Sequence, residues 1–419
     1  MRQPLGPCRD ALITWSLRTT LLVSLSALTA CAGAQSSLSA SGSSARAIES
    51  GQVLPASGQV LPASGQVLPA SGQVLPACQE PNGTHCHGLR NAVVAANPSA
   101  VAASIYGYTP FDLRNAYGLG QAAVPKGMLN GNAKGLWKQQ PAVAIVSAYD
   151  DANAESDLGI YRNRFGLPPC TTSNGCFTKV AQNSAPPAPA GWMEETSLDL
   201  AMVSAACPNC RIVLVEAPSD DTDLIGGAVD YAASLNPAAL SVSFGVDEQL
   251  FLSTGHAFGG TGDHYTHPGI PIVASAGDDG TPQFPASSPN VIAVAGTSLH
   301  RDSSARGFNE QLWAPSSVGC SIGEAAPSWQ STSCSTRSVA DVGFDADPTT
   351  GVAVYDSNDG GWIVMGGTSV GAPFVAGLFG AANDYPSGAL GAAPLYSRAS
   401  ALYPLSSGAL GTPNGLGAF

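Results

Sequence analysis

Charged side chains are scarce in this sequence, and basic ones are the scarcest. Of its 419 residues only 11% are charged, and 17 Lys and Arg stand against 30 Asp and Glu, so the formal net charge is −13 at pH 7. Because nucleic acids and anionic lipids attract basic surfaces, this balance argues against both as partners. The composition, with 44% hydrophobic residues, is that of a globular chain able to bury a core, in one large domain or two ordinary ones.

The apolar run near the N-terminus is too short for a permanent membrane helix. It covers residues 21–30, and we interpret residues 1–31 as a signal peptide. Cys31 ends an LTAC tetrapeptide that resembles the bacterial lipobox, in which the cysteine is lipidated. The alternative is ordinary cleavage after Ala32 or Ala34, which both offer a small-x-small site. We therefore expect export, with the protein either secreted or attached to the membrane of a bacterial cell envelope by lipidated Cys31.

A low-complexity segment separates this signal from the rest of the chain. Residues 50–77 hold four tandem copies of SGQVLPA, and every copy contains a Gly and a Pro and no charge. Such a sequence cannot hold a helix, so residues 32–77 are interpreted as a spacer. Residues 78–107 form a short N-terminal segment, and residues 108–419 are assigned to one folded domain.

The cysteines support export. Setting aside Cys8 and Cys31 leaves an even number, which fall into neighbouring pairs along the sequence and are expected to close small surface loops as disulfides. The pairs are Cys78/Cys86, Cys170/Cys176, Cys207/Cys210 and Cys320/Cys334, although the sequence alone does not fix the connectivity. The CPNC spacing could also mark a redox motif, but no thioredoxin-like context surrounds it, and no second ligand pair suggests zinc.

Short apolar runs alternate with helical patterns from residue 108 onward. Strands are predicted at 141–147, 211–215, 239–244 and 270–275, and helices at 195–206 and 224–235. This alternation predicts an α/β fold built on a mostly parallel sheet with helices on both faces. In such sheets the functional residues gather beyond the carboxyl ends of the strands, and Asp278 follows one such end.

Two short motifs carry the candidate chemistry. Ser369 lies in the stretch GGTSVGAP, where glycines allow a sharp turn and Pro373 suits the first turn of a following helix. Glu195 and Asp199 stand at positions i and i+4 and so share one face of a helix. A serine hydroxyl needs a base to become a nucleophile, and the base needs a group that orients it. Glu195 is the candidate base and Asp199 its orienting group.

The combination of Glu-x-x-x-Asp with a later Gly-Thr-Ser-x-x-x-Pro resembles the sedolisin (serine-carboxyl) peptidases, relatives of the subtilases. The stretches ASAGDDG, around Asp278, and SVSFG, at residues 241–245, match further blocks of that family, and the resemblance covers roughly residues 105–382. It implies a subtilisin-like α/β fold with a single catalytic domain. It also implies a serine-type endopeptidase that cuts polypeptides through an acyl-enzyme.

The resemblance gives a role to each matching residue. The proposed set is Ser369 as nucleophile, Glu195 as base, Asp199 as its orienting group, Asp278 as oxyanion donor, and Ser243, Phe244 and Gly245 as the lining of the substrate groove. A carboxyl group donates a hydrogen bond only when it is protonated, so an acid pH optimum is expected. None of the six histidines occupies the His-Gly-Thr setting of a subtilase base, and all are interpreted as loop or surface residues.

Two departures from the family pattern stand out. The segment between the spacer and Tyr108 is too short for the large N-terminal pro-domain that sedolisins generally carry. Residues 395–419 contain no acidic residue, although the family ends in a calcium loop, so we expect no calcium, no other metal and no cofactor.

These departures leave alternatives open. One is a catalytically weak or inactive homologue that acts as a surface binding module. Another is an esterase or amidase of small substrates, which would need a closed pocket in place of a groove. The leading hypothesis is an exported acid endopeptidase that works as a monomer.

Overall fold

The structure is a computed structural model that describes residues 73–78, 83–91, 105–120, 127–129, 134–259, 263–404 and 417–418. The predicted signal peptide, Cys31 and most of the repeat spacer lie outside these residues. The predictions about export and lipidation therefore stay predictions.

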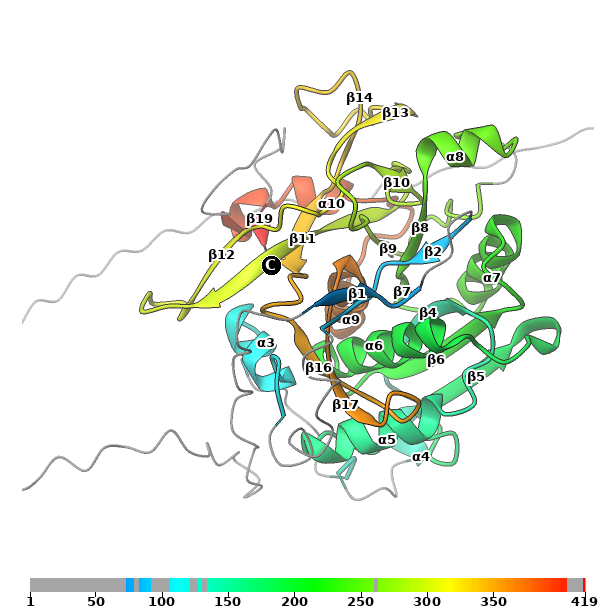
Figure 1. The fold of residues 1–419 in the computed structure, drawn as a ribbon, viewed down its shortest axis with the longest axis vertical. Coiled ribbons are helices and arrows are strands. Elements are labelled where there is room, and N and C mark those ends of the chain that lie inside the picture. The colour runs from blue at the N-terminus through cyan, green and yellow to red at the C-terminus, as the bar shows by residue number, and fades with distance from the viewer. Residues whose placement is uncertain are drawn as a thin grey trace, which may run out of the picture. The chain divides into compact units, whose positions relative to one another are not determined.

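A large sheet forms the centre of the fold (Figure 1). Its strands, in spatial order, are β18 (Tyr403–Pro404), β19 (Gly417–Ala418), β15 (Val342–Asp345), β11 (Ile292–Arg301), β9 (Ile272–Ser275), β7 (Ala239–Val242), β4 (Ala142–Ala148), β6 (Arg211–Ala217) and β5 (Phe177–Ala181). Every neighbouring pair from β15 to β5 is parallel. Strand β12 (Phe308–Leu312) pairs in the antiparallel direction with residues 297–301, the C-terminal half of β11. The predicted mostly parallel sheet is confirmed.

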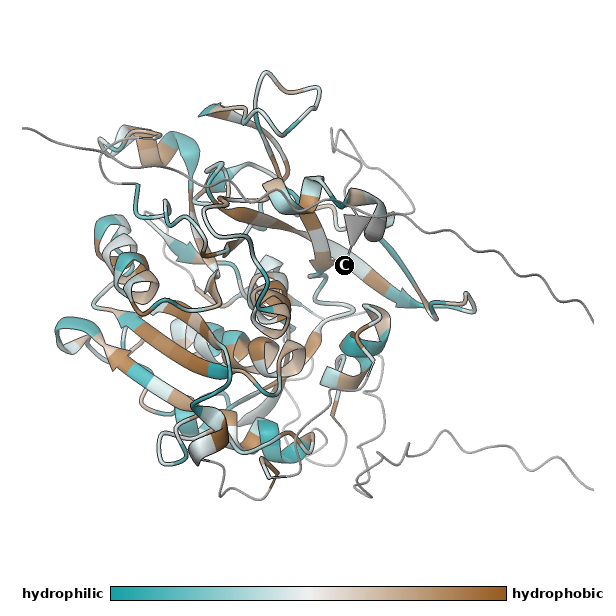
Figure 2. Ribbon diagram, turned by 180° about the vertical axis from the view of Figure 1, so that it is seen from behind, coloured by the Kyte–Doolittle hydropathy of each residue, from teal (hydrophilic) through white to brown (hydrophobic). Residues whose placement is uncertain are grey.

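Helices cover both faces of this sheet, as predicted. The helices α6 (Ala190–Ala206) and α9 (Gly371–Ala382) pack together on one face, and α7 (Thr222–Ser234) packs against β4 and β6 from the other. Successive side chains of a strand point to opposite faces. Val143 and Ile145 of β4 accordingly join the core beneath α6 and α9, whereas Ala144 and Val146 join the core beneath α7. Both faces being buried explains why the central strands are almost uniformly hydrophobic (Figure 2).

The predicted elements agree with the structure except at one point. The prediction of one strand at 239–244 is wrong. The strand ends before Ser243, and a separate strand, β8 (Phe244–Asp247), follows it. Strand β8 leaves the large sheet and pairs in antiparallel fashion with β10 (Gln283–Phe284) and β2 (His85–Cys86). A run of apolar residues cannot show that two halves of it pair with different partners.

The segment before residue 92 adds strands to two small sheets. Strand β1 (Val74–Pro76), which lies in the last SGQVLPA repeat, pairs with β3 (Leu89–Asn91). Strand β3 pairs in turn with β17 (Gly361–Gly366), which pairs with β16 (Val352–Asp356). The N-terminal segment therefore joins both β8 and β17.

Shorter elements complete the described residues. The helices are α3 (Pro110–Ala116), α4 (Lys134–Trp137), α5 (Ala154–Arg164), α8 (Glu248–Ser253) and α10 (Ala393–Tyr396), with single 3₁₀ turns at Gln182–Ser184, Thr368–Val370 and Ala399–Ala401. Strands β13 (Gly319–Ala325) and β14 (Thr336–Val339) form a separate hairpin.

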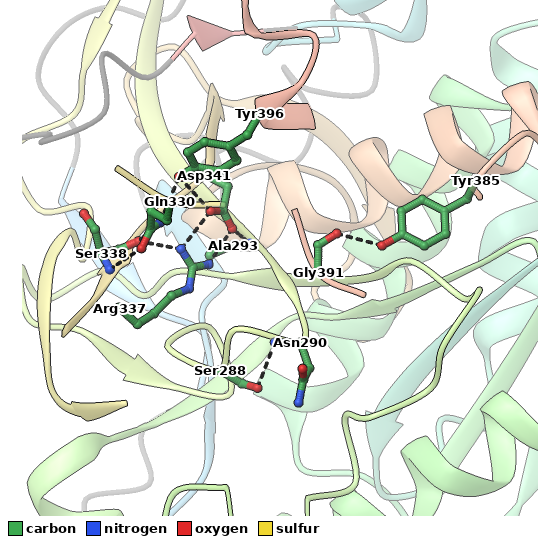
Figure 3. A network of polar contacts seen from close by, with 10 residues as sticks. All are labelled: Ser288, Asn290, Ala293, Gln330, Arg337, Ser338, Asp341, Tyr385, Gly391 and Tyr396. Atoms are coloured by element: carbon green, nitrogen blue, oxygen red, sulfur yellow. Dashed lines mark hydrogen bonds and ion pairs between the residues drawn. The ribbon is translucent and has the colours of Figure 1, made fainter. Parts of the chain in front are cut away.

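A buried ion pair lies at the base of that hairpin (Figure 3). Arg337 donates two hydrogen bonds to the carboxylate of Asp341, at 2.8 and 2.5 Å, and both side chains are fully buried. The same carboxylate accepts the backbone N–H of Ala293 at 2.8 Å and the hydroxyl of Tyr396 at 3.1 Å. Asp341 thus ties the hairpin, strand β11 and helix α10 to one another.

The four predicted cysteine pairs are all disulfides in the structure: Cys78–Cys86, Cys170–Cys176, Cys207–Cys210 and Cys320–Cys334. Within the described residues, no helix combines the length and the apolar character needed to cross a bilayer.

Candidate active site

Ser369 lies on a tight turn between β17 and α9. Gly367 adopts φ +88°, a conformation that favours glycine, and the turn Thr368–Val370 leads directly into the helix. Pro373 lies in the first helical turn, where its missing N–H costs no hydrogen bond. The Ser369 side chain is fully buried, and its hydroxyl donates to the Ser243 carbonyl oxygen at 3.4 Å. The turn thus holds the hydroxyl at a fixed point beyond β17.

Glu195 and Asp199 both project from α6 toward this turn. Each is almost completely buried. Asp199 accepts a hydrogen bond from the Ser243 hydroxyl at 2.6 Å, whereas neither carboxylate oxygen of Glu195 has a partner of standard geometry among the described residues. Burial of an ionised carboxylate without hydrogen bonds costs free energy, so such a group is either protonated or used to bind a partner. Glu195 therefore has the free hydrogen-bonding capacity that a general base requires.

Electrostatics link Glu195 to the other candidates. Burial raises the pKa of Glu195 well above its usual value, and the charges of Asp199 and Asp278 raise it further. The Ser369 hydroxyl lies near enough to lower that pKa, although its hydrogen bond of standard geometry goes to Ser243. Catalytic hydrogen bonds are often long in the absence of substrate. Burial also raises the pKa of Asp199, and the Ser243 hydrogen bond opposes this rise. The charge of Asp199 thus opposes the ionisation of Glu195, so the titrations of the two carboxyl groups are linked.

Asp278 faces the turn from the end of β9. Its Oδ1 accepts the Thr368 backbone N–H at 2.8 Å, and the Gly277 N–H donates to the Thr368 hydroxyl at 3.0 Å. Its Oδ2 is buried and has no hydrogen-bond partner among the described residues. Burial raises the pKa of Asp278 to about 7. Below that pH the carboxyl group is protonated, and Oδ2 is the oxygen left free to donate.

The predicted groove residues take different positions. Ser243 points its hydroxyl at Asp199 and its carbonyl oxygen at Ser369. Phe244 is buried in the core beneath α7, and its backbone pairs with Cys86 of the neighbouring strand β2. Gly245 is packed against the His87 ring and the Gln283 side chain, and an added Cβ would lie 2.7 Å from each. The structure brings Ser369, Glu195, Asp199 and Asp278 together, with Ser243 between them.

Comparison with known proteins places this geometry in a family. The model of the subtilase family matches residues 183–394, which is half of the chain. The chain belongs to the subtilase family. Among curated proteins, kumamolisin from Bacillus sp. (strain MN-32) is 28% identical over 310 residues, which are 66% of this chain and 52% of that protein. Sedolisin from Pseudomonas sp. (strain 101) is 36% identical over 151 residues, or 32% of this chain and 25% of that protein. The predicted resemblance to sedolisins is confirmed.

Solved structures agree on the fold of this subtilase. A Pseudomonas sedolisin, described as a serine-carboxyl proteinase complexed with two molecules of pseudo-iodotyrostatin, has a TM-score of 0.62 at 23% identity. The match covers 75% of this chain and 96% of that one. The chain spans about half or less of the length of the curated relatives it matches. The predicted subtilisin-like fold class is confirmed.

Sequence reasoning missed two parts of the site. The Ser243 hydroxyl was assigned to the groove, although it is a hydrogen-bond partner of Asp199. His87 was interpreted as a loop or surface histidine. It does lie in the loop between β2 and β3, but the surface interpretation is wrong, because the residue is 2% exposed and its ring is hydrogen-bonded at both nitrogens. The disulfide partner Cys86 beside it was the one available signal that this segment is held in place.

No cluster of three or more His, Cys, Asp or Glu side chains that could bind a metal occurs in the described part of the subtilase chain. Residues 405–416, where a C-terminal calcium loop would be sought, lie outside the described residues. The expected lack of calcium therefore stays a prediction.

Proposed function

We propose that this chain is a serine-carboxyl endopeptidase that cuts extended polypeptides at acid pH. The proposal rests on one observation: the Ser369 hydroxyl and three carboxyl groups lie together in the fold. Ser369, Glu195 and Asp199 are buried, and Asp278 is half-buried. The pKa of each carboxyl group is raised by burial. Such shifts are found where acid–base chemistry is performed.

The proposed mechanism assigns one step to each group. Glu195 takes the proton of Ser369 as the hydroxyl oxygen attacks the substrate carbonyl carbon, and returns that proton to the leaving amine. Asp199, held by Ser243, orients Glu195 and shares its charge. Protonated Asp278 donates from Oδ2 to the developing oxyanion, while its Oδ1 is held by Thr368.

Peptide digestion tests this proposal. Hydrolysis of an unstructured peptide is followed across the acid range for wild type, Ser369→Ala and Glu195→Gln. Removal of the nucleophile or the base is expected to lower kcat by at least about 10²-fold. Ser197→Ala and Glu155→Gln are matched controls. Ser197 lies on α6 with no hydrogen-bond partner among the described residues, and Glu155 lies half-buried on α5, where its Oε1 accepts the Thr172 backbone N–H at 2.9 Å, a bond that the amide oxygen of Gln can also accept. Equal hydrolysis by all five proteins would exclude the mechanism.

We also propose that the enzyme is exported and that it needs no calcium. Four disulfides support an oxidising compartment. The absence of carboxylates from residues 395–419 supports calcium independence. A calcium chelator is expected to leave the rate unchanged. Conversion of Cys31 to Ser is expected to move a lipid-anchored protein from the membrane fraction to the medium, and to change nothing if it is freely secreted.

A further inference from the structure

A second group of carboxyl side chains lies where α6 meets the turn between β16 and β17. Glu194 projects from α6, and Asp359 lies in that turn. Arg90 of β3 bonds to both of them, because its Nη1 donates to Glu194 Oε1 at 3.1 Å and also to Asp359 Oδ1. The two carboxyl groups therefore contact the same nitrogen atom and lie side by side.

The remaining oxygens of these two carboxyl groups have no donor. Glu194 Oε2 and Asp359 Oδ2 are buried, and neither has a hydrogen-bond partner among the described residues. Two ionised carboxylates only accept hydrogen bonds, so these oxygens cannot bond to each other while both groups are charged. When one group holds a proton, it donates to the other, and both oxygens are satisfied.

The balance of charge also requires a proton here. The charged groups that face Glu194 are Arg90, Asp359 and Asp356. One guanidinium thus faces three carboxyl groups, and Asp157 of α5 adds another beside Asp356. Glu194 is only 4% exposed, and a buried charge that no partner neutralises is costly.

The pKa of Glu194 agrees with this balance. Burial raises it to about 9, together with a hydrogen bond to Asp359 and the charge of Asp359, although Arg90 opposes the rise. Glu194 therefore keeps its proton through the acid and neutral range. Because this pKa lies above the usual 4.5, the contribution to stability is complete in acid and is lost as pH rises through about 9.

The turn that carries Asp359 is held in place by its own contacts. Asp356 Oδ1 accepts the backbone N–H groups of Asn358 and Asp359, at 2.7 and 3.2 Å. Asp157 Oδ2 accepts both the backbone N–H and the hydroxyl of Ser357 at 2.9 Å. Asp359 therefore has a fixed position relative to α5 and to the start of β17.

A bond at this position bears on the catalytic residues because of where α6 and β17 lead. Successive residues of a helix point about 100° apart, so Glu194 faces the turn while the next residue, Glu195, faces the nucleophile. Strand β17 leads from the same turn into the turn of Ser369. The contact between Glu194 and Asp359 thus joins the helix that carries the base to the strand that leads to the nucleophile.

We propose that Glu194 and Asp359 share one proton and that this carboxyl pair positions α6 against β17, which makes Glu194 a positioning residue for the base Glu195. The catalytic consequence rests on the proposed function, whereas the shared proton does not. Loss of the proton leaves two adjacent carboxylates that repel each other, so α6 is no longer held at the same distance from the nucleophile turn.

The kinetic test compares Glu194→Gln with Glu194→Ala in peptide hydrolysis at acid pH. The Gln amide accepts from Arg90 and donates to Asp359 without a shared proton, so this variant is expected to keep kcat within about twofold of wild type. Glu194→Ala removes the bond and is expected to lower kcat by at least about tenfold, with KM changed by less than about twofold, since the pair acts through the base. Asp384→Ala, on an exposed segment after α9, is the matched control and is expected to leave both constants unchanged.

A second measurement tests the proton itself and needs no activity. The Tm of Ser369→Ala is followed from near pH 7 to near pH 10, and it is expected to fall as pH rises through about 9. Addition of Glu194→Gln is expected to reduce this fall by at least about 3 °C, because an amide has no proton to lose. Addition of Asp384→Ala is expected to leave the fall unchanged.

The outcomes separate this inference from the proposed function. If hydrolysis depends on Ser369 but Glu194→Ala keeps the wild-type kcat, or loses no more than Glu194→Gln, the proposed function stands and the positioning role falls. A raised KM at unchanged kcat would show that the pair acts on substrate binding, and would also overturn it. An equal fall of Tm with and without Glu194→Gln would exclude the shared proton. If wild type hydrolyses no peptide, the proposed function and the positioning role both fail, while the Tm comparison still supports or contradicts the shared proton.

Discussion

Asp278 Oδ1 accepts a hydrogen bond from Thr368, whereas Oδ2 has no partner among the described residues. This difference leads to a prediction about how the rate depends on pH. Since the carboxyl group donates only when protonated, the wild-type kcat/KM is expected to fall as pH rises through about 7, the pKa to which burial raises it. Asp278→Asn keeps an acceptor for the Thr368 N–H and supplies a donor that does not titrate. It should therefore remain active where wild type declines.

Asp278→Ala is the complementary variant, because it supplies no donor at any pH. It is expected to lose about 10²–10³ in kcat below pH 7, where the wild-type carboxyl group is protonated, and the difference should shrink above that pH. The measurement for both variants is kcat/KM against pH. If Asp278→Asn declined at the same pH as wild type, the titrating group would not be Asp278.

Ser243 is predicted to act through Asp199, since its hydroxyl donates to that carboxylate at 2.6 Å. The hydrogen bond lowers the pKa of Asp199, so Ser243→Ala is expected to raise that pKa and to move the acid limb of the pH–rate profile to higher pH. A loss of about tenfold in kcat is expected from the missing bond. Ser241→Ala on β7 is the control, because its buried hydroxyl has no partner among the described residues. A shift of equal size in both variants would rule out a specific positioning role.

The β13–β14 hairpin is expected to depend on the Arg337–Asp341 ion pair. Removal of one partner leaves a buried charge uncompensated, so Arg337→Leu is expected to lower the free energy of unfolding by about 3–5 kcal/mol. Arg164→Leu, on the exposed side of α5, is expected to change it by less than about 0.5 kcal/mol. Chemical denaturation of both variants gives the comparison. A loss no greater for Arg337→Leu than for Arg164→Leu would show that the pair does not stabilise the hairpin.

Local spacing explains which parts of the site could be predicted. Glu195 and Asp199 share a helix, and Ser369 lies on a glycine turn, so a few consecutive residues determine each placement. Strand pairing is different, because β2 and β8 are joined across residues that are more than 150 positions apart in the chain. Neither the break at Ser243 nor the burial of His87 is visible in a short window of sequence, because both depend on that distant pairing.

Buried carboxyl groups are expected to make the whole molecule more stable in acid. Burial raises the pKa of Asp151 to about 6, of Glu324 to about 7 and of Glu216 to about 8. Each group binds its proton more tightly when folded, so its contribution is complete below its unfolded pKa and is lost as pH rises through its folded pKa. His87, whose pKa is lowered to about 3, acts in the opposite direction as pH falls below its unfolded value. Because three carboxyl groups act in one direction and one histidine in the other, the net expectation is a more stable fold in acid.

The net charge of −13 at pH 7 adds to this effect, since protonation reduces repulsion within the folded chain. The Tm of Ser369→Ala, which cannot digest itself under the proposed mechanism, is therefore expected to be at least about 5 °C higher near pH 5 than near pH 8. Thermal unfolding followed by circular dichroism measures this difference. A higher Tm at the alkaline pH would show that groups other than these carboxyls control the stability.

The most direct measurement is acid-quenched mass spectrometry of the acyl-enzyme, because the central claim is that a carboxylate deprotonates the serine. During turnover of an activated ester, wild type is predicted to carry the acyl group on Ser369. Glu195→Gln is predicted to form it at least about 10²-fold more slowly, with the fold unchanged. Acylation of Glu195→Gln at the wild-type rate, or an acyl group on another residue, would contradict the account.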